Sequence, residues 1–246
     1  MRIIRDRCTD CGHCLFYCPV EAIFLREGTV VINDERCVEC GVCLRSDICP
    51  EDALFANPLS WPRTLRSAFS DLKSPYSVPS PSGRGGRGVK EELKTNDVVG
   101  RIRGDLARIS IEVGRPRGGA SFREVEKVTT ALAGIGCVFE SDFPTTLLMS
   151  DTSCGRLRKD ILDEVVLYAP VSCTLSFDRL GSLLDEMERL SGEIDALFVG
   201  SVILRMSEQG FPPSLGQHED LVKAMLSKNG KVNVGLGRAS GEASSR

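Results

Sequence analysis

Apolar residues in the second half of the chain switch between the spacing typical of strands and that typical of helices. Residues 106–113 alternate and are rich in β-branched side chains, which predicts a strand. Ser121, followed three residues later by Glu124, predicts a helix start, and the helix is expected to end near Gly134 and Gly136. The same patterns predict a helix at 177–190 and one at 218–226, and strands at 137–140, 145–150, 165–175, 195–206 and 232–236.

This order of elements predicts an α+β fold for residues 105–240. A strand, a helix, two strands, a helix and a strand in succession fit a split-βαβ (ferredoxin-like) α/β sandwich, and the last helix and strand would add an extra αβ unit. In that fold an antiparallel sheet carries its helices on one face. The second domain resembles no known family closely.

The first 56 residues have short apolar stretches, which predict strands at 2–5 and 29–32, a helical turn at 20–23 and a turn at 51–54. Eight of the eleven cysteines lie among them, in the runs C-T-D-C-G-H-C-L-F-Y-C-P and C-V-E-C-G-V-C-L-R-S-D-I-C-P. The first run has the spacing C-x2-C-x2-C-x3-C-P. In such a run three thiolates on a tight loop can wrap one iron–sulfur cube, and the fourth ligand comes from elsewhere.

The two runs resemble the bacterial two-[4Fe–4S] ferredoxin family, and the resemblance covers residues 1–56. It implies two [4Fe–4S] clusters with crossed ligands: Cys8, Cys11, Cys14 and Cys49 for cluster 1, and Cys37, Cys40, Cys43 and Cys18 for cluster 2. One departure is that five residues, 44–48, separate the last two cysteines of the second run, where the family has three. We expect this longer loop to change the packing at the edge of cluster 1.

Other uses of these cysteines are possible. A disulfide framework is typical of small secreted domains, and the chain opens M-R-I-I-R-D without an apolar signal segment. A zinc ribbon pairs two C-x2-C motifs and does not use triplets that end in C-P. A domain with one cluster lost or converted to three irons is the remaining alternative. Cys137, Cys154 and Cys173 match no ligand spacing and are expected to be ordinary small apolar residues.

Residues 57–104 are rich in proline, serine, glycine and basic residues, which predicts a flexible linker between the two domains. An alternative is that Arg84, Arg87 and Lys90 dock onto the acidic cluster domain or a partner. Trp61 is expected to anchor the start of the linker against the cluster domain.

The net charge of −3 divides into −4 for residues 1–56, +5 for 57–104 and −4 for the rest. Two oxidised clusters with four thiolates each would add about −2 apiece to the first domain. This field favours redox partner proteins with basic docking faces and disfavours nucleic acid. No apolar run is long enough to span a membrane, and a reducing cytoplasm, in an anaerobic metabolism, is the expected location.

The glycine-rich turn between the strand at 106–113 and the following helix is a candidate site for a small anion such as a phosphate or carboxylate. Backbone N–H groups at the helix start would bind it with the help of two arginines. The residues concerned are Gly114, Arg115, Arg117, Gly118, Gly119 and Ser121. Ala120 stands where a P-loop has its lysine, so nucleotide hydrolysis is disfavoured. The alternative is a purely structural turn.

The sequence therefore predicts an electron-transfer protein or redox subunit with two clusters and a C-terminal domain that binds a partner or ligand. Whether the chain is itself an enzyme stays open, because no catalytic residues and no flavin or nicotinamide fingerprint are found. The alternatives are an iron–sulfur reductase whose second domain binds an organic substrate, and a ferredoxin-fused ligand sensor.

Overall fold

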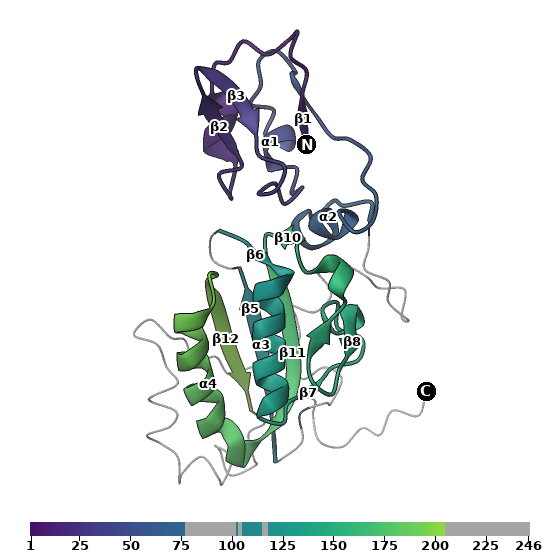
Figure 1. Cartoon of the computed structure of the whole chain (residues 1–246), viewed down its shortest axis with the longest axis vertical. Coiled ribbons are helices and arrows are strands. Elements are labelled where there is room, and N and C mark those ends of the chain that lie inside the picture. The colour runs from purple at the N-terminus through teal and green to yellow at the C-terminus, as the bar shows by residue number, and fades with distance from the viewer. Residues whose placement is uncertain (77–101, 103–104, 115–117, 205–246) are drawn as a thin grey trace, which may run out of the picture.

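The computed structural model describes residues 1–76, 102, 105–114 and 118–204. A small unit, residues 1–56, lies above a larger unit of sheet and helices, and helix α2 (Thr64–Ser70) lies where the two meet (Figure 1). The expected helix at 218–226 and the strand at 232–236 fall outside the described residues, and so do Arg84, Arg87 and Lys90 of the docking alternative.

The small unit is built from two short antiparallel strand pairs. Strand β1 (Arg2–Ile3) pairs with β4 (Leu54–Phe55), and β2 (Ile23–Arg26) forms a hairpin with β3 (Thr29–Ile32). The strand at 29–32 is confirmed. The prediction of a helical turn at 20–23 is wrong, since Ile23 pairs with Ile32 in the hairpin. The helical turns lie instead between the cysteines, in a 3-10 helix (His13–Tyr17) and in α1 (Val42–Arg45).

The larger unit contains a four-stranded antiparallel sheet in the order β12-β5-β11-β7. These strands are β12 (Phe198–Ile203), β5 (Leu106–Val113), β11 (Ala169–Ser176) and β7 (Val138–Phe139). At the centre of the sheet, Ile109 pairs with Cys173 on one side and Val202 on the other. The expected strand at 106–113 is confirmed with the same bounds.

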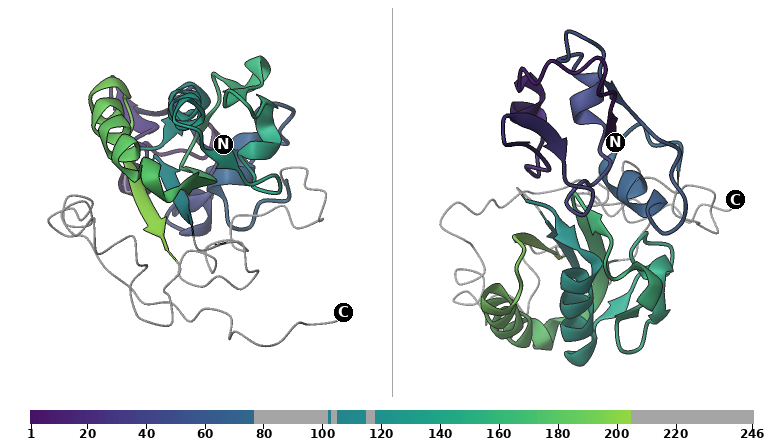
Figure 2. Two further views of the ribbon diagram at one scale, coloured as in Figure 1. Left: turned by 90° about the horizontal axis from the view of Figure 1, so that it is seen from below. Right: turned by 45° about the horizontal axis from the view of Figure 1, so that its top comes forward.

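Two helices, α3 (Phe122–Gly134) and α4 (Leu180–Glu193), contact each other and cover one face of this sheet (Figure 2). The Ser121 hydroxyl accepts a hydrogen bond from the Glu124 backbone N–H, as the capping pattern predicted. The inner side of α3 is fully buried and consists of Phe122, Val125, Val128 and Leu132. Burying this apolar stripe is the main stabilising contribution of the helix.

A chain excursion separates β7 from β11. It contains β8 (Met149–Asp151), β9 (Arg156–Leu157) and β10 (Val165–Val166). The expected strand at 145–150 begins later, after a 3-10 turn at Thr146–Leu148. The apolar run at 165–175 forms two strands, because β10 pairs with β6 (Ala120–Ser121) and β11 pairs with β5.

The start of the expected linker is folded onto the larger unit. Leu65 and Phe69 of α2 are buried in the core formed by the sheet, α3 and α4, and the Phe69 ring meets the Phe122 ring edge to face. The prediction of a flexible linker over all of residues 57–104 is therefore wrong for α2. Leu65 and Phe69 are four residues apart and lie on one helix face, a signal too short to stand out from the surrounding prolines and serines.

Trp61 anchors this segment to the larger unit and not to the small one. Its indole N–H donates a 2.8 Å hydrogen bond to the Asp160 carboxylate. The Arg158 guanidinium lies 4.8 Å from the centre of the indole ring. The expected contact of Trp61 with the cluster domain is thus corrected, since both partners follow β9 in the larger unit.

Candidate metal centres

Two cavities in the small unit are each lined by four cysteine side chains. The first is lined by Cys8, Cys11, Cys14 and Cys49. The second is lined by Cys18, Cys37, Cys40 and Cys43. The fold thus brings each fourth cysteine to the three cysteines of the other run, which are the two sets expected from the sequence.

The donor geometry fits a cluster better than a single ion. A tetrahedral zinc ion with bonds of about 2.3 Å needs four sulfurs within about 4 Å of one another. Within the described part of the chain, no three histidine, cysteine or acidic side chains are close enough to hold one metal ion. The sulfurs instead surround a cavity, as the ligands of an iron–sulfur cube do.

The two cysteine loops share an unusual backbone conformation. Gly12 and Gly41 follow the second cysteine of each run and have φ angles of 75° and 66°. Each immediately precedes a short helix, at His13–Tyr17 and Val42–Arg45. Positive φ is readily adopted by glycine, which explains why the repeat places this residue type at both positions.

The fourth cysteine of each run accepts a hydrogen bond from the backbone. The N–H of Ala22 donates to Cys18 Sγ at 3.1 Å, and the N–H of Ala53 donates to Cys49 Sγ at 3.2 Å. Hydrogen bonds to ligand sulfurs stabilise the thiolate and are one of the ways in which a protein sets the potential of a cluster.

Burial differs between the two cavities. Cys11 of the first set is exposed, whereas Cys40 and Cys43 of the second set are buried. Burial, followed by the nearby cysteines, raises the pKa of the Cys43 thiol to about 12. In the metal-free protein this thiol is protonated at neutral pH, so binding iron must release its proton.

An apolar contact places the larger unit against the second cavity. Val20, Val38 and Cys40 form a small buried cluster in the small unit, and Val165 and Leu167 of the larger unit pack against it. The larger unit therefore covers the side of the second cavity that an isolated domain would expose.

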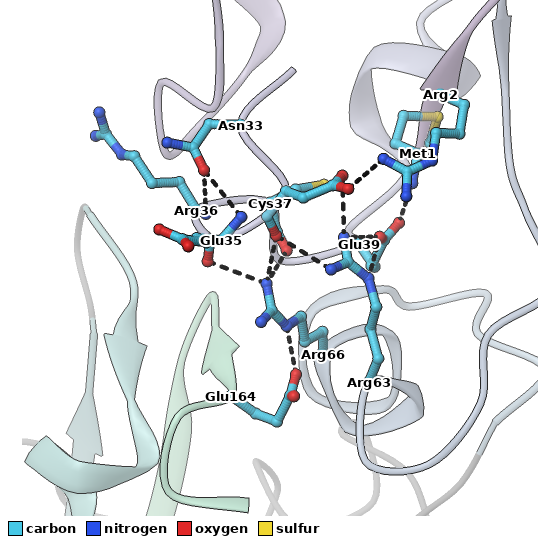
Figure 3. Close-up of polar contacts among 11 residues, drawn as sticks. Met1, Arg2, Asn33, Glu35, Arg36, Cys37, Glu39, Arg63, Arg66 and Glu164 are labelled. Carbon is cyan, nitrogen blue, oxygen red and sulfur yellow. Dashed lines mark hydrogen bonds and ion pairs between the residues drawn. The ribbon is translucent and has the colours of Figure 1, made fainter.

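Two arginines of the α2 segment contact the loop that leads to Cys37 (Figure 3). Arg63 donates to the Glu39 carboxylate at 2.9 and 2.6 Å. Arg66 donates from Nη1 to three backbone carbonyls, those of Asp34, Glu35 and Cys37, at 2.8, 3.0 and 2.9 Å. Sequence reasoning missed both residues, because their only signal was the basic composition of a segment expected to be a linker.

Glu39 lies between two positive groups beside the second cavity. Its carboxylate accepts a 2.6 Å hydrogen bond from the α-amino group of Met1, in addition to those from Arg63. Burial alone would raise the pKa of Glu39, but the hydrogen bonds from Met1 and Arg63 outweigh it and lower the pKa below its usual value. Glu39 is therefore a carboxylate at neutral pH and holds this corner of the small unit together.

The longer loop of the second run contributes a third arginine. Arg45, in α1, donates to the carbonyl of Cys40 at 2.7 Å and forms a 2.8 Å ion pair with Asp71, which follows α2. The loop of residues 44–48 thus contacts the loop of the second cavity through Arg45, and it also precedes Cys49. The expected change of packing at the edge of cluster 1 stays a prediction.

The glycine-rich turn packs closely against the backbone of the larger unit. A Cβ on Gly119 would lie 2.7 Å from the Val166 carbonyl oxygen, and one on Gly114 would lie 2.8 Å from that of Leu167. The first N–H groups of α3 already have acceptors: Phe122 donates to Glu164, Arg123 to Leu162 and Glu124 to Ser121. These donors therefore contribute nothing to an anion site, and Arg115 and Arg117 lie outside the described residues.

The three remaining cysteines lie in the larger unit. Cys137 and Cys173 are buried, as expected of small apolar residues, and Cys154 is partly exposed in the turn that connects β8 to β9. A hydrogen bond with Cys137, together with burial, raises the pKa of Cys173.

Comparison with known proteins identifies the small unit. The family model of the 4Fe-4S dicluster domain matches residues 7–56, which contain all eight of these cysteines. Residues 7–56 are a 4Fe-4S dicluster domain. The cofactors of this dicluster domain are two [4Fe–4S] clusters, which accept and donate single electrons when bound. The C-terminal part has no recognised family.

The curated relatives match the chain over a short part of its length. A ferredoxin of Rickettsia felis is 37% identical over 54 residues, which are 21% of this chain and 48% of the relative. One tetrathionate reductase subunit, from Salmonella typhimurium, is 45% identical over 53 residues, 20% of each chain. The pyruvate synthase subunit PorD of Thermotoga maritima is 36% identical over 56 residues, 22% of this chain and 54% of the relative. The chain thus spans about half or less of the length of these relatives.

No solved structure matches the chain significantly. Among the helices that the structure describes, none combines the length and the apolar character that a membrane crossing requires. The similarity to ferredoxins and to subunits of reductases supports an electron-transfer role.

Proposed function

We propose that the chain is an electron-transfer subunit that passes single electrons to or from an oxidoreductase through its dicluster domain. The observation that supports this most strongly is the pair of cavities, each lined by four cysteines drawn from both halves of the repeat. In this proposal cluster 1 is held by Cys8, Cys11, Cys14 and Cys49, and cluster 2 by Cys18, Cys37, Cys40 and Cys43.

The difference in burial between the two cavities supports an approach of the redox partner from the side of cluster 1. The side of cluster 1 carries the exposed Cys11, whereas the larger unit packs against the side of cluster 2. A redox partner can therefore approach cluster 1 most closely. Two of the relatives are named as subunits of tetrathionate reductase and pyruvate synthase, which supports a partner that is an oxidoreductase subunit.

We further propose that the larger unit is a split-βαβ sandwich and that it binds the partner subunit. The sheet order β12-β5-β11-β7 and the two helices on one face support this fold. The burial of Leu65 and Phe69 supports a domain boundary before α2 and not at residue 105. Because such clusters are sensitive to oxidation and their ligands are free thiols, a reducing cytoplasm is the proposed location.

Anaerobic electron transfer tests this function. The full chain, reconstituted with iron and sulfide, is reduced with dithionite and freed of excess reductant. It is then mixed with a ferredoxin-dependent oxidoreductase that is in its oxidised form. The proposal predicts uptake of one electron per cluster and reoxidation of the chain as the oxidoreductase is reduced. Clusters that cannot be reduced reversibly, or that pass no electrons to any such enzyme, would contradict it.

A further inference from the structure

The arginine at the centre of Figure 3 connects the ligand loop of cluster 2 to the larger unit. The Arg66 side chain is only 8% exposed. Its Nη1 donates to the carbonyls of Asp34, Glu35 and Cys37, and its Nε contacts the Glu164 carboxylate. One side chain thus links residues 34–37, α2 and the segment just before β10.

The arrangement of the acceptors around Arg66 requires a guanidinium group at this position. A guanidinium presents a rigid planar fork of donors, which a lysine ammonium cannot reproduce. Three carbonyls that converge on one Nη1 hold the peptide groups just before and at Cys37 in a fixed arrangement. Cys37 is a proposed ligand of cluster 2, so the place of its sulfur depends on this contact.

The charge of Arg66 has an electrostatic consequence for the bound cluster. A cluster with four thiolates goes from about −2 to about −3 when it gains an electron. A fixed cation nearby stabilises the more negative state, and low exposure limits the screening of this effect by water and salt. Glu164 acts in the opposite sense, because its negative charge offsets part of that of Arg66.

The neighbouring charged groups are arranged differently. Arg63 binds the Glu39 carboxylate directly and is less buried than Arg66, with 26% of its side chain exposed. Arg45 is 34% exposed and forms its ion pair with Asp71. Arg66 is therefore the most shielded of the three arginines, and the one that joins the loop of residues 34–37 to Glu164, just before β10.

We propose that Arg66 is a positioning residue for cluster 2, which holds the loop of residues 34–37 in place and raises the reduction potential of that cluster. Glu164 limits the size of this effect from the larger unit. This inference depends on the proposed electron-transfer function and adds the residue pair that tunes one of its two centres.

The test is a potentiometric titration of the full chain, reconstituted anaerobically and followed by electron paramagnetic resonance. Each step transfers one electron from dithionite to one oxidised cluster, and no bond to cysteine is broken. The signal of cluster 2 is assigned with the Cys49→Ser variant, which is expected to lack cluster 1. The variants are Arg66→Gln, Arg66→Lys and Glu164→Gln. Arg123→Gln, which removes an exposed arginine paired with Asp163, serves as the matched control.

Opposite shifts are expected from the two members of the pair. At a fixed potential near the midpoint of cluster 2, Arg66→Gln should lower its ratio of reduced to oxidised form at least threefold. That change corresponds to about 30 mV for one electron. Glu164→Gln should raise the same ratio. Arg66→Lys keeps the positive charge but not the planar fork of donors, so it should lower the ratio less than Arg66→Gln does. The potential of cluster 1 should stay the same in every variant, and Arg123→Gln should move neither cluster.

The outcomes separate the inference from the function on which it depends. If the chain without any substitution lacks two reversibly reducible clusters, the proposed function is contradicted. If both clusters are intact and Arg66→Gln changes neither potential, or shifts both potentials by the same amount, the inference is overturned. The proposed function is then unaffected. If Arg66→Gln loses cluster 2, Glu164→Gln decides: a raised potential supports the role of Arg66, and an unchanged or lowered one overturns it.

Discussion

Phe69 and Phe122 pack edge to face, with ring centroids 5.3 Å apart and ring planes at 86°. The first belongs to α2 and the second begins α3, so this contact ties the segment after the dicluster domain into the core of the larger unit. Residues that by composition resemble a tether therefore contribute to the stability of the second domain.

Replacing Phe69 with alanine should destabilise the larger unit by about 3–5 kcal/mol, the range typical of a buried phenylalanine. Denaturant unfolding of the full chain, followed by the fluorescence of Trp61, measures this change. Leu72→Ala is the matched control, since Leu72 is 79% exposed and its loss should change the free energy of unfolding by less than about 0.5 kcal/mol. Equal effects of the two substitutions would contradict the role given to α2.

How far the sequence predicts this fold depends on the length of each pattern. The strand Leu106–Val113 and the cap of α3 at Ser121 have long or specific signals, and the structure has them where they were expected. Helix α2 has only two buried apolar residues in a segment of prolines and serines, so local pattern does not reveal it. Its position is decided by contacts with residues far away in the chain, such as that of Phe69 with Phe122.

The same limit applies to the metal centres. The cysteine spacing predicts the two sets that line the cavities, because ligand spacing is a local property of the chain. The contacts of Arg66 with Cys37 and Glu164 join residues that are 29 and 98 positions apart. No local pattern encodes such contacts, and only the folded arrangement shows them.

Two adjacent glycines provide a test of how the units meet. Gly118 and Gly119 both have positive φ, at 98° and 75°, so alanine is strained at either position. At Gly119 a Cβ would also lie 2.7 Å from the Val166 carbonyl oxygen and 3.4 Å from Val20 of the small unit, whereas at Gly118 nothing lies within 4 Å. We expect Gly119→Ala to destabilise the chain clearly more than Gly118→Ala.

Thermal unfolding and limited proteolysis of the two variants measure this difference. Gly119→Ala should unfold at a lower temperature and should be cleaved faster near residues 114–121 than Gly118→Ala. If the two variants behave alike, the close approach of this turn to Val166 is not important for stability.

The crossed assignment of ligands predicts which thiols become free when one ligand is lost. In the Cys49→Ser variant, Cys8, Cys11 and Cys14 should become reactive towards iodoacetamide, because they share a cavity with Cys49. In the Cys18→Ser variant the reactive set should be Cys37, Cys40 and Cys43. Peptide mass spectrometry after anaerobic alkylation identifies the modified residues. Reactive thiols within the same run as the substituted cysteine would contradict the crossing.

Removal of iron should affect the two units differently. The small unit has few buried apolar residues, so its clusters supply much of its stability, whereas the larger unit has an extensive core of its own. A chelator under oxidising conditions should abolish the visible absorbance and the hydrogen-exchange protection of residues 1–56 together. Protection of β5 and α3 should remain. Retained native structure in an iron-free small unit would contradict this expectation.

The central claim is that eight thiolates of this chain bind two iron–sulfur cubes that exchange electrons. The most direct measurement is an iron and sulfide analysis of the anaerobically reconstituted chain combined with reductive titration. The account predicts about eight irons and eight sulfides per chain, and two reversible one-electron reductions. Bound zinc, or at most four irons with a single reducible centre, would contradict it.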